Sequence, residues 1–470
     1  MRLEGLRVHG RSLALGRRTG SRQRAVVGHG SPQRTPGQRV VRRRRGLPPR
    51  VPAVNLPRSR RRATAGTNRR NPLRYLLLGA GLQGTAIAWD LLRQVDDTET
   101  LTVVDRDQAA LDRLAARLGD EPRLVLQRGD VGDGRLLDPL LDTASTVISA
   151  VNYWFNDDLT ARAIERGAHF LDLGGNNDIV ARQLARDEAA RRAGVTIVPD
   201  SGLAPGLAGI LGWHLARAMD PCESVRLRVG GLPQRPRPPL EYQLVFSVQG
   251  LINEYIEDCV VIRDGQIKHV PGLSELESIT FPEPFGELEA FQTSGGTSTL
   301  PQSLLGHVQQ LDYKTLRYRG HCEQIRLLDD LGLTASEPEQ IEGAWIAPRA
   351  MLARRLEAVL PREGDDVVLL LAEAEGTLDG RPTRSSIRII DRNDPATGLS
   401  AMMRMTGFPT AILARMLATG AVDAPGARPQ ETVFPADRIL DELARRGVAV
   451  ERWSSDPSRP DPGPQEARNS

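Results

Sequence analysis

The sequence predicts an α/β fold: a Rossmann-type, doubly wound parallel sheet, followed by a second α+β domain that contains an antiparallel sheet. Three observations predict it. A short apolar strand runs directly into the motif GAGLQG and then into an amphipathic helix. From residue 72 to about 200, apolar runs alternate with helical stretches, as βαβ units do. After residue 206, several strand-like segments follow one another without a helix between each pair, which favours antiparallel pairing.

The motif GAGLQG stands where dinucleotide binding requires it, between a strand and a helix. Gly79 permits a tight turn, Gly81 lets the backbone approach a pyrophosphate, and Gly84 lets the helix pack on the strand. Backbone amides at the helix N-terminus then hold the phosphate charge. A glycine turn in an ordinary α/β unit is the simpler alternative. Because strand, helix and a downstream acid are all present, we predict a dinucleotide site that also includes Leu82 and Gln83.

The second apolar run ends in Asp105, 21 residues after Gly84. A carboxylate at this position accepts a hydrogen bond from the ribose 2′-hydroxyl and repels the 2′-phosphate of NADP. The sequence therefore favours NAD. Arg106 follows Asp105 and is able to pair with a 2′-phosphate, so NADP remains the alternative cofactor.

Three later strands of the predicted sheet also end in polar or glycine-rich residues. The carboxyl ends of such strands hold cofactor and substrate, although Asp, Asn and Gly are common in ordinary turns as well. The further cofactor contacts predicted there are Asp130, Val131, Ala150, Val151, Asn152, Leu173 and Gly174. Asp172 ends the fifth strand, is expected near the nicotinamide, and is a catalytic candidate.

Charge divides the chain into an Arg-rich tail and an acidic body. Residues 1–70 carry 20 Arg and one acidic residue, a net charge of +19, whereas the rest of the chain carries −16. Low hydrophobicity and high net charge predict that the tail is disordered. The run Arg42–Arg45 is typical of segments that bind nucleic acid or anionic membranes. We favour a solvated extension instead, and we expect no nucleic-acid or membrane partner.

The rest of the composition indicates a cytoplasmic protein. No stretch is long and apolar enough to span a bilayer. The three cysteines lack CxxC spacing, which predicts neither a disulfide framework nor a zinc site. We expect no bound metal.

The patterns predict five consecutive segments. They are a disordered tail (1–70), a nucleotide-binding domain (71–203), an α+β substrate and dimerisation domain (204–400), a C-terminal segment returning to the nucleotide domain (401–453) and a disordered end (454–470). The strands expected in the second domain are 225–229, 242–247, 260–265, 367–372 and 386–390. The homodimer is an expectation for the second domain.

The second domain contains one dense polar block, a hydroxyl- and glycine-rich loop at 291–300 followed by the run 312–321. The substrate-binding candidates are Thr293, Ser294, Thr297, Arg317 and Tyr242. Arg317 is suited to clamp a carboxylate with two hydrogen bonds.

Two residues of the run 312–321 are candidates for the general base. Lys314 is one of only two lysines in the chain, and a lysine is able to lose its proton and act as a base, whereas an arginine is not. His321 titrates near neutrality and is able to transfer protons. A surface lysine and a structural histidine are the alternatives.

Several motifs in order resemble the saccharopine-dehydrogenase-like family, and within it most closely the lysine 6-dehydrogenases. The motifs are GAGLQG, DLGGN, PDSGLAPG, VGGLP, QTSGGTSTL, YKTLRYRGH and AMMRMTGFP, and the resemblance runs from about residue 73 to about 450. It implies NAD-dependent oxidation of the lysine ε-amine to 2-aminoadipate 6-semialdehyde, with release of ammonia. Asn152 and Ser201 depart from the family pattern, which commonly has Pro and Cys there.

The implied chemistry needs a neutral amine, because only a free lone pair assists the loss of hydride. Deprotonating an amine of pKa about 10.4 at pH 7 costs about 4.6 kcal/mol, so a base is expected. Two other functions remain open. One is a saccharopine or carboxyspermidine-type reductase that uses NADPH, and the other is a non-enzymatic protein that senses a nucleotide.

Overall fold

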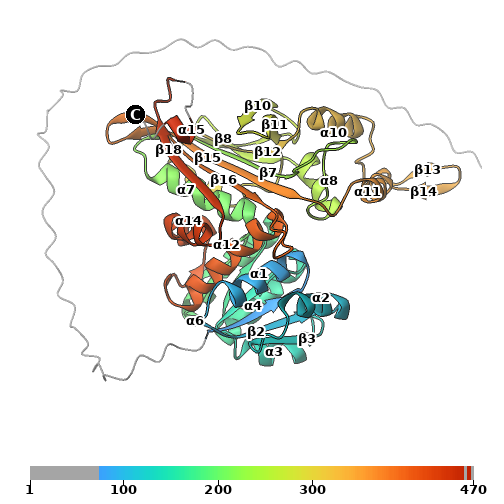
Figure 1. The fold of residues 1–470 in the computed structure, drawn as a ribbon, viewed down its shortest axis with the longest axis vertical. Helices are drawn as coiled ribbons and strands as arrows, with labels where there is room; N and C mark the ends of the chain where they lie inside the picture. The colour runs from blue at the N-terminus through green and yellow to red at the C-terminus, as the bar shows by residue number, and fades with distance from the viewer. Residues whose placement is uncertain (1–72, 460–462, 467–470) are drawn as a thin grey trace, which may run out of the picture. The chain divides into compact units, whose positions relative to one another are not determined.

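The structure, a computed structural model, describes residues 73–459 and 463–466 (Figure 1). The predicted tail 1–70 lies outside these residues. Part of the end that we expected to be disordered is regular: Ser454 and Ser455 close strand β18 (Ala449–Ser455), and helix α15 spans Gly463–Glu466. The reason is that β18 pairs along β16 (Arg381–Arg392), and this backbone ladder outweighs the local composition.

The described residues first form a parallel sheet of seven strands, in the order β17-β6-β5-β4-β1-β2-β3. The strands are β1 (Leu73–Leu78), β2 (Thr98–Asp105), β3 (Leu124–Arg128), β4 (Thr146–Ser149), β5 (His169–Asp172), β6 (Thr196–Val198) and β17 (Gly426–Ala427). The helices between them are α1 (Leu82–Arg93), α2 (Gln108–Leu118), α3 (Gly134–Leu141), α4 (Asn156–Arg166), α5 (Asn177–Leu184) and α6 (Asp187–Ala193), with a short 3₁₀ turn η1 (Tyr153–Phe155). The predicted Rossmann-type sheet is confirmed.

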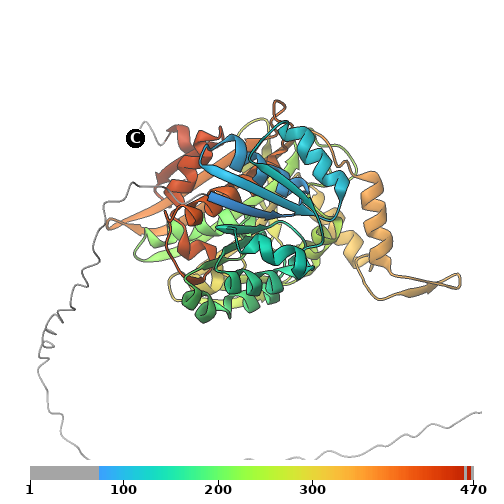
Figure 2. The same cartoon turned by 90° about the horizontal axis from the view of Figure 1, so that it is seen from below.

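Both faces of the parallel sheet are covered, which explains the nearly continuous apolar run of β1. Leu77 belongs to one buried cluster, whereas Leu76 and Leu78 belong to another on the opposite face. Figure 2 views this sheet from below, with strands β1 to β6 coloured blue to green. Because all strands are parallel, their carboxyl ends lie along one edge, which we call the cofactor edge.

The second sheet contains nine of the described strands and is mixed rather than purely antiparallel. Its main path is β10-β11-β12-β7-β15-β16-β18, and β8 and β9 attach beside β12. The strands not yet named are β7 (Cys222–Pro233), β8 (Cys259–Arg263), β9 (Gln266–Val270), β10 (Glu277–Phe281), β11 (Gly286–Gln292), β12 (Gln310–Arg317) and β15 (Asp366–Leu378). Only β12 and β7 are parallel among the pairs of this sheet that the structure describes; the expected antiparallel pairing is otherwise confirmed.

The helices of the second part pack on this sheet or project from its end. They are α7 (Ala208–Arg217), α8 (Val248–Ile256), α9 (Leu300–Leu304), α10 (His321–Asp330), α11 (Pro348–Val359), α12 (Ala401–Ala418), α13 (Gln430–Val433) and α14 (Ala436–Arg445). A short kinked turn η2 (Leu203–Leu207) precedes α7, and the hairpin β13 (Glu339–Ile341) and β14 (Ala344–Ile346) precedes α11. Figure 1 shows α7 and α12 on the side of the mixed sheet that faces the parallel sheet.

The predicted strand at 242–247 is wrong. These residues are irregular and lead into α8. Their apolar side chains instead join the buried cluster formed with α8 and α10, so the alternation of apolar residues serves this core rather than a strand ladder.

The segment 401–453 divides between the two sheets. Helix α12 packs along α1, β4 and β5, and β17 pairs with β6 of the parallel sheet. Strand β18, however, pairs with β16 of the mixed sheet, contrary to the expectation that the whole segment returns to the nucleotide domain. The ladder with β16 satisfies backbone groups that an edge strand would otherwise expose.

Candidate active site

The three glycines of the loop after β1 have three different surroundings. Gly79 has a φ of +104°, and a side chain there would press on the Ala150 carbonyl. A Cβ on Gly84 would overlap the Gly79 carbonyl oxygen, so α1 requires a glycine to pack this closely. Nothing lies within 4 Å of the Cβ position of Gly81. The loop therefore fits a dinucleotide, because its middle glycine leaves the backbone open to a phosphate.

Asp105 is held in place at the end of β2. Its Oδ2 accepts a hydrogen bond from the Ala80 amide at 2.7 Å, and its Oδ1 accepts one from the Asp107 amide at 2.8 Å. Arg106 is exposed beside it. A fixed carboxylate thus stands next to the glycine loop, where the ribose of a dinucleotide binds.

The other predicted cofactor residues lie at the same cofactor edge. Gln83 has a buried Oε1 without a hydrogen-bond partner, and Leu82 is 63 % exposed. The residues that follow β3, β4 and β5 are Asp130, Val131, Ala150, Val151, Asn152, Leu173 and Gly174. Val131 is a core residue, whereas Asp130 and Asn152 are exposed.

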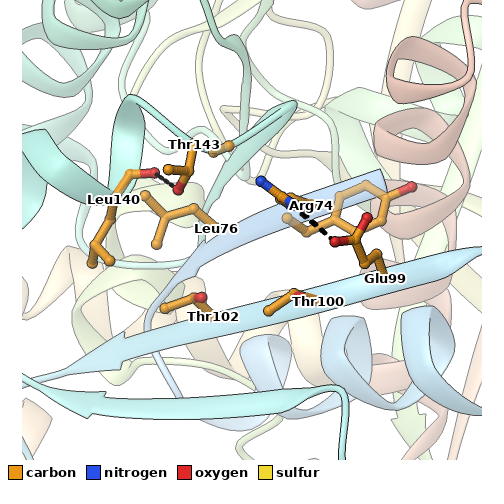
Figure 3. A pocket seen from close by; sticks show the side chains of 9 residues that line it. Arg74, Leu76, Glu99, Thr100, Thr102, Leu140 and Thr143 are labelled. Carbon is orange, nitrogen blue, oxygen red and sulfur yellow. Dashed lines mark hydrogen bonds and ion pairs between the residues drawn. The ribbon is translucent and has the colours of Figure 1, made fainter. Parts of the chain in front are cut away.

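A pocket of about 240 Å³ lies elsewhere on the parallel sheet (Figure 3). Arg74 at the start of β1 is ion-paired with Glu99 of β2 in this pocket, at 2.9 Å. Thr143, which precedes β4, also lines it. These residues lie at the amino ends of the strands, whereas dinucleotides bind at the carboxyl ends, so this pocket is not the cofactor site.

Asp172 is fully buried at the end of β5. Its Oδ1 accepts hydrogen bonds from the amides of Gly174 at 2.7 Å and Asp200 at 3.3 Å. Its Oδ2 accepts one from Gln183 Nε2 at 2.6 Å. Burial raises the pKa of Asp172 above its ordinary value. Because both oxygens already have donors, the contacts favour a positioning role, and the catalytic role stays a prediction.

Asp200 follows β6 and joins the cofactor edge to the mixed-sheet part of the chain. The Ser298 hydroxyl, from the predicted polar loop, donates to Asp200 Oδ2. Both residues have left-handed backbone conformations, with φ of +59° and +43°, which is uncommon for residues other than glycine. Burial and the neighbouring charge of Asp172 raise the pKa of Asp200 to about 7. Neither Asp200 nor Ser298 was among the predicted site residues.

Strand β12 presents alternate side chains to opposite faces of the mixed sheet. Tyr313 belongs to the buried cluster that includes α7 and α12, whereas Leu316 belongs to a cluster on the other face. By this alternation Arg317 shares the face of Tyr313, toward α7 and α12. Lys314 lies on the opposite face.

The contacts of Lys314 do not support its predicted role as the base. Its Nζ donates to Glu277 Oε2 at 2.9 Å and to the Glu275 carbonyl at 2.7 Å. Glu277 also pairs with Arg228, which pairs with Asp312. Because Lys314 is part of this ion network, its contacts favour a structural role.

His321 is the first residue of α10 and both its ring nitrogens are occupied. Its Nδ1 lies 2.9 Å from the Leu240 carbonyl, which only accepts, so Nδ1 carries the proton. Its Nε2 then accepts from the Tyr255 hydroxyl at 2.9 Å, and Tyr255 accepts from Arg317 Nε at 3.1 Å. Burial and the charge of Arg317 lower the pKa of His321 to about 3. A histidine that stays neutral does not support the predicted transfer of protons near pH 7.

The predicted hydroxyls of the polar loop are engaged within the mixed-sheet part. The pairs are Thr293 Oγ1 with Thr315 Oγ1 at 2.6 Å, Ser294 Oγ with Glu257 Oε2 at 3.1 Å, and Thr297 Oγ1 with the Val260 carbonyl at 3.4 Å. These bonds shape the loop, and Ser298 is the residue that it extends to the cofactor edge. Their role in substrate binding stays a prediction.

Tyr242, Glu254, Tyr255, Arg317 and His321 form a polar cluster that we call the arginine cluster. The Arg317 guanidinium lies 4.7 Å from the centre of the Tyr242 ring. Glu254 of α8 is partly buried. Burial raises the pKa of Glu254 to about 7, against the opposing charge of Arg317. Arg317, Tyr242 and His321 were predicted as site residues, whereas Glu254 and Tyr255 were not, because nothing in the sequence of α8 marks it as part of a site.

Within the described residues, no group of His, Cys, Asp and Glu is arranged to hold a metal ion. The cysteines Cys222, Cys259 and Cys322 are buried free thiols.

Comparison with known proteins identifies two matching domains. Residues 75–198 match the saccharopine dehydrogenase NADP binding domain, and residues 202–448 match the saccharopine dehydrogenase C-terminal domain. The family resemblance expected from the motifs is therefore confirmed.

Individual relatives are distant in sequence. A saccharopine dehydrogenase [NADP(+), L-glutamate-forming] of Schizosaccharomyces pombe is 20% identical over 80% of this chain and 98% of its own length. The corresponding enzyme of Pyricularia oryzae is 23% identical over 64% of this chain and 66% of its own length. The mitochondrial alpha-aminoadipic semialdehyde synthase of Bos taurus is 22% identical over 80% of this chain, which spans only 47% of that protein.

A solved structure shows the same fold. Apo saccharopine dehydrogenase (L-Glu forming) from Saccharomyces cerevisiae has a TM-score of 0.67 and 22% identity, covering 82% of this chain and 100% of that one. The two domain matches together span most of the chain in the order that the structure shows. This chain belongs to the saccharopine dehydrogenase family.

Proposed function

We propose that this chain oxidises the amine-bearing carbon of an amino acid, with the lysine ε-amine as the reacting group and NAD as the cofactor. The Asp200–Ser298 pair at the cofactor edge carries this proposal. An ammonium group must lose a proton before its carbon releases hydride, and Asp200 has a pKa of about 7. When bound, the nicotinamide accepts the hydride. Ser298 Oγ passes the amine proton to Asp200, and water then converts the substrate imine to an aldehyde and ammonia.

The choice of NAD is supported by Asp105, whose carboxylate is fixed by two backbone amides at the ribose position. The names of the relatives include NADP(+), and Arg106 is available beside Asp105. Reduction with NADPH, with saccharopine or a carboxyspermidine-type compound as product, is therefore the alternative. A purely nucleotide-sensing role is the second alternative.

An absorbance assay at the wavelength of reduced nicotinamide separates these functions. The protein is incubated with lysine or saccharopine and with NAD or NADP, and the reverse reactions are run with NADH or NADPH. We expect reduced cofactor to form with lysine and NAD. Turnover of saccharopine but not lysine would assign the reaction of the relatives instead. Nucleotide binding without turnover of any substrate would favour the sensing role.

The pH dependence tests the role of Asp200. Because only the ionised carboxylate accepts a proton, we expect kcat/KM of the parent to rise with pH through about 7. Asp200→Asn should lower turnover about 100-fold or more and remove this rise. Asp264→Asn is the matched control, since it makes the same change at an exposed carboxylate in the β8–β9 turn, where Asp264 pairs with Lys268 at 3.1 Å. Equal pH profiles for the parent and Asp200→Asn would exclude Asp200 as the base.

A second measurement on the same variant needs no substrate. The pKa of Asp200 is raised by burial, so this group favours the folded state below its unfolded pKa and loses that contribution as pH rises through about 7. The melting temperature of the parent, relative to Asp200→Asn, should therefore fall between pH 5 and pH 8.

The oligomeric state and the cellular location of this chain stay proposals. No helix in the described part of the chain is long and apolar enough to cross a membrane. Homodimer formation is supported by the β13–β14 hairpin, where Trp345 is 72 % and Ile341 is 49 % exposed; a mass measurement in solution tests it. The cytoplasmic location stays a prediction.

A further inference from the structure

Three polar groups of the arginine cluster lack partners although the groups around them are satisfied. Tyr242 is 2 % exposed, and its hydroxyl has no hydrogen-bond partner among the described residues. Arg317 donates through Nε and one terminal nitrogen, to Tyr255 and to the Leu316 carbonyl, while its second terminal nitrogen donates to no described residue. Buried polar groups normally have partners, so open groups side by side indicate a ligand.

Glu254 supplies the opposite charge. Its carboxylate accepts no hydrogen bond from the residues that the structure describes, and its charge acts on Arg317, Tyr242, Tyr255 and Tyr313. The open guanidinium nitrogen of Arg317 and the open carboxylate of Glu254 interact electrostatically and together suit one small group of mixed charge. A free amino acid carries a carboxylate and an ammonium on the same carbon, and these two charges need a donor and an acceptor in just this arrangement.

We propose that Glu254 accepts the α-ammonium of the substrate while Arg317 and the Tyr242 hydroxyl bind its α-carboxylate. The site thus recognises a free amino acid by its backbone end and leaves the side chain to reach the cofactor edge. This inference rests on the proposed amine oxidation for the identity of the reacting end. Glu254 is a specificity-determining residue in this scheme and takes no part in the hydride step.

The polar loop connects the two ends of such a substrate. The Ser294 amide donates to the Glu254 carbonyl at 2.8 Å, and four residues later Ser298 reaches Asp200. Between them Gly296 lies against the Tyr313 ring so closely that a Cβ would overlap it. We call Glu254, Arg317 and Tyr242 the clamp. One loop therefore fixes the position of the clamp relative to the Asp200–Ser298 pair, as a substrate with two separated amines requires.

Binding of norleucine tests the clamp without relying on the reaction. Norleucine has both α groups but no ε-amine, hexanoate lacks the α-amine, and pentylamine lacks the carboxylate. By calorimetry we expect the parent to bind norleucine more tightly than either fragment. Glu254→Gln should weaken norleucine about 10- to 100-fold and leave hexanoate unchanged, as loss of a charged hydrogen bond predicts. Glu323→Gln, the same change at an exposed position of α10, should bind norleucine as the parent does.

Two results would overturn the clamp. One is norleucine binding by Glu254→Gln that equals the parent's, with both proteins folded by melting temperature. The other is equal affinity of the parent for norleucine and hexanoate. Failure of the proposed reaction has a different signature, namely norleucine binding that depends on Glu254 in a protein that does not oxidise lysine. If lysine is oxidised, 6-aminohexanoate should be a poorer substrate for the parent, and Glu254→Gln should reduce that preference about tenfold or more.

Discussion

The cofactor edge and the arginine cluster are built in opposite ways. The loop from Gly79 to Gly84 is one continuous segment whose shape depends on backbone contacts, such as the fit of Gly84 against the Gly79 carbonyl. The arginine cluster collects side chains from a loop, α8, β12 and α10, and it depends on which way each side chain points. The first region is defined by the absence of side chains and the second by their orientation. A substitution in the first region therefore acts through shape, and one in the second acts through charge.

The largest effect is expected from a matched pair of buried cations on β12. Arg317→Met should lower kcat/KM by about 2 to 5 kcal/mol, at least about 30-fold, because it removes the donor and leaves the Glu254 charge uncompensated. Lys314→Met should lower the melting temperature through the ion network with Glu277 and leave kcat/KM near that of the parent. Steady-state kinetics and melting curves of both variants decide the matter. Equal losses of kcat/KM in the two variants would show that the face of β12 on which a residue lies does not decide whether it acts in the site or only stabilises the fold.

The two glycines of the cofactor loop provide the second test. Gly84→Ala should destabilise the protein by about 1 to 3 kcal/mol, because its Cβ would meet the Gly79 carbonyl oxygen. Gly81→Ala has open space and an ordinary φ of −71°, so its melting temperature should match the parent's while its affinity for the cofactor falls. Thermal melting with and without NAD measures both. A stable Gly84→Ala protein would contradict the shape argument.

The smallest effect is expected at the end of β2. Asp105→Ser removes a charged acceptor, and NAD affinity should fall by about 1 to 2 kcal/mol, roughly tenfold, while NADP affinity improves. Arg106→Ser is the control, since it leaves the carboxylate in place. Titration of both cofactors against the three proteins gives the preference. Equal use of NAD and NADP by the parent would mean that Asp105 does not select the cofactor.

The contrast between the two regions also explains which features were predictable from sequence. A strand, a glycine loop, a helix and Asp105 follow one another at fixed spacing, so the cofactor edge could be predicted from the sequence alone. The two proposed bases were chosen by residue type, and type does not show that Lys314 faces away from Arg317 or that Leu240 and Tyr255 occupy His321. Asp200 lies in the motif PDSG after the sixth strand. This position is equivalent to that of Asp172 at the end of the fifth strand, so the same reasoning could have made Asp200 a site candidate. Glu254 had no local signal, because its proposed role depends on Arg317, which comes much later in the chain.

Helix α12 limits how freely the nucleotide-binding domain of this chain could be exchanged with that of a relative during evolution. The nucleotide-binding match ends at residue 198, yet one side of α1 is covered by α12, which begins at Ala401. Gly407 approaches Ala86 so closely that any larger residue would collide with it. If the nucleotide-binding domain alone were replaced by that of a relative, α12 of this chain would have to pack on an α1 of different sequence. Point changes at the end of β2 therefore offer a shorter evolutionary route to a new cofactor than recombination of whole modules.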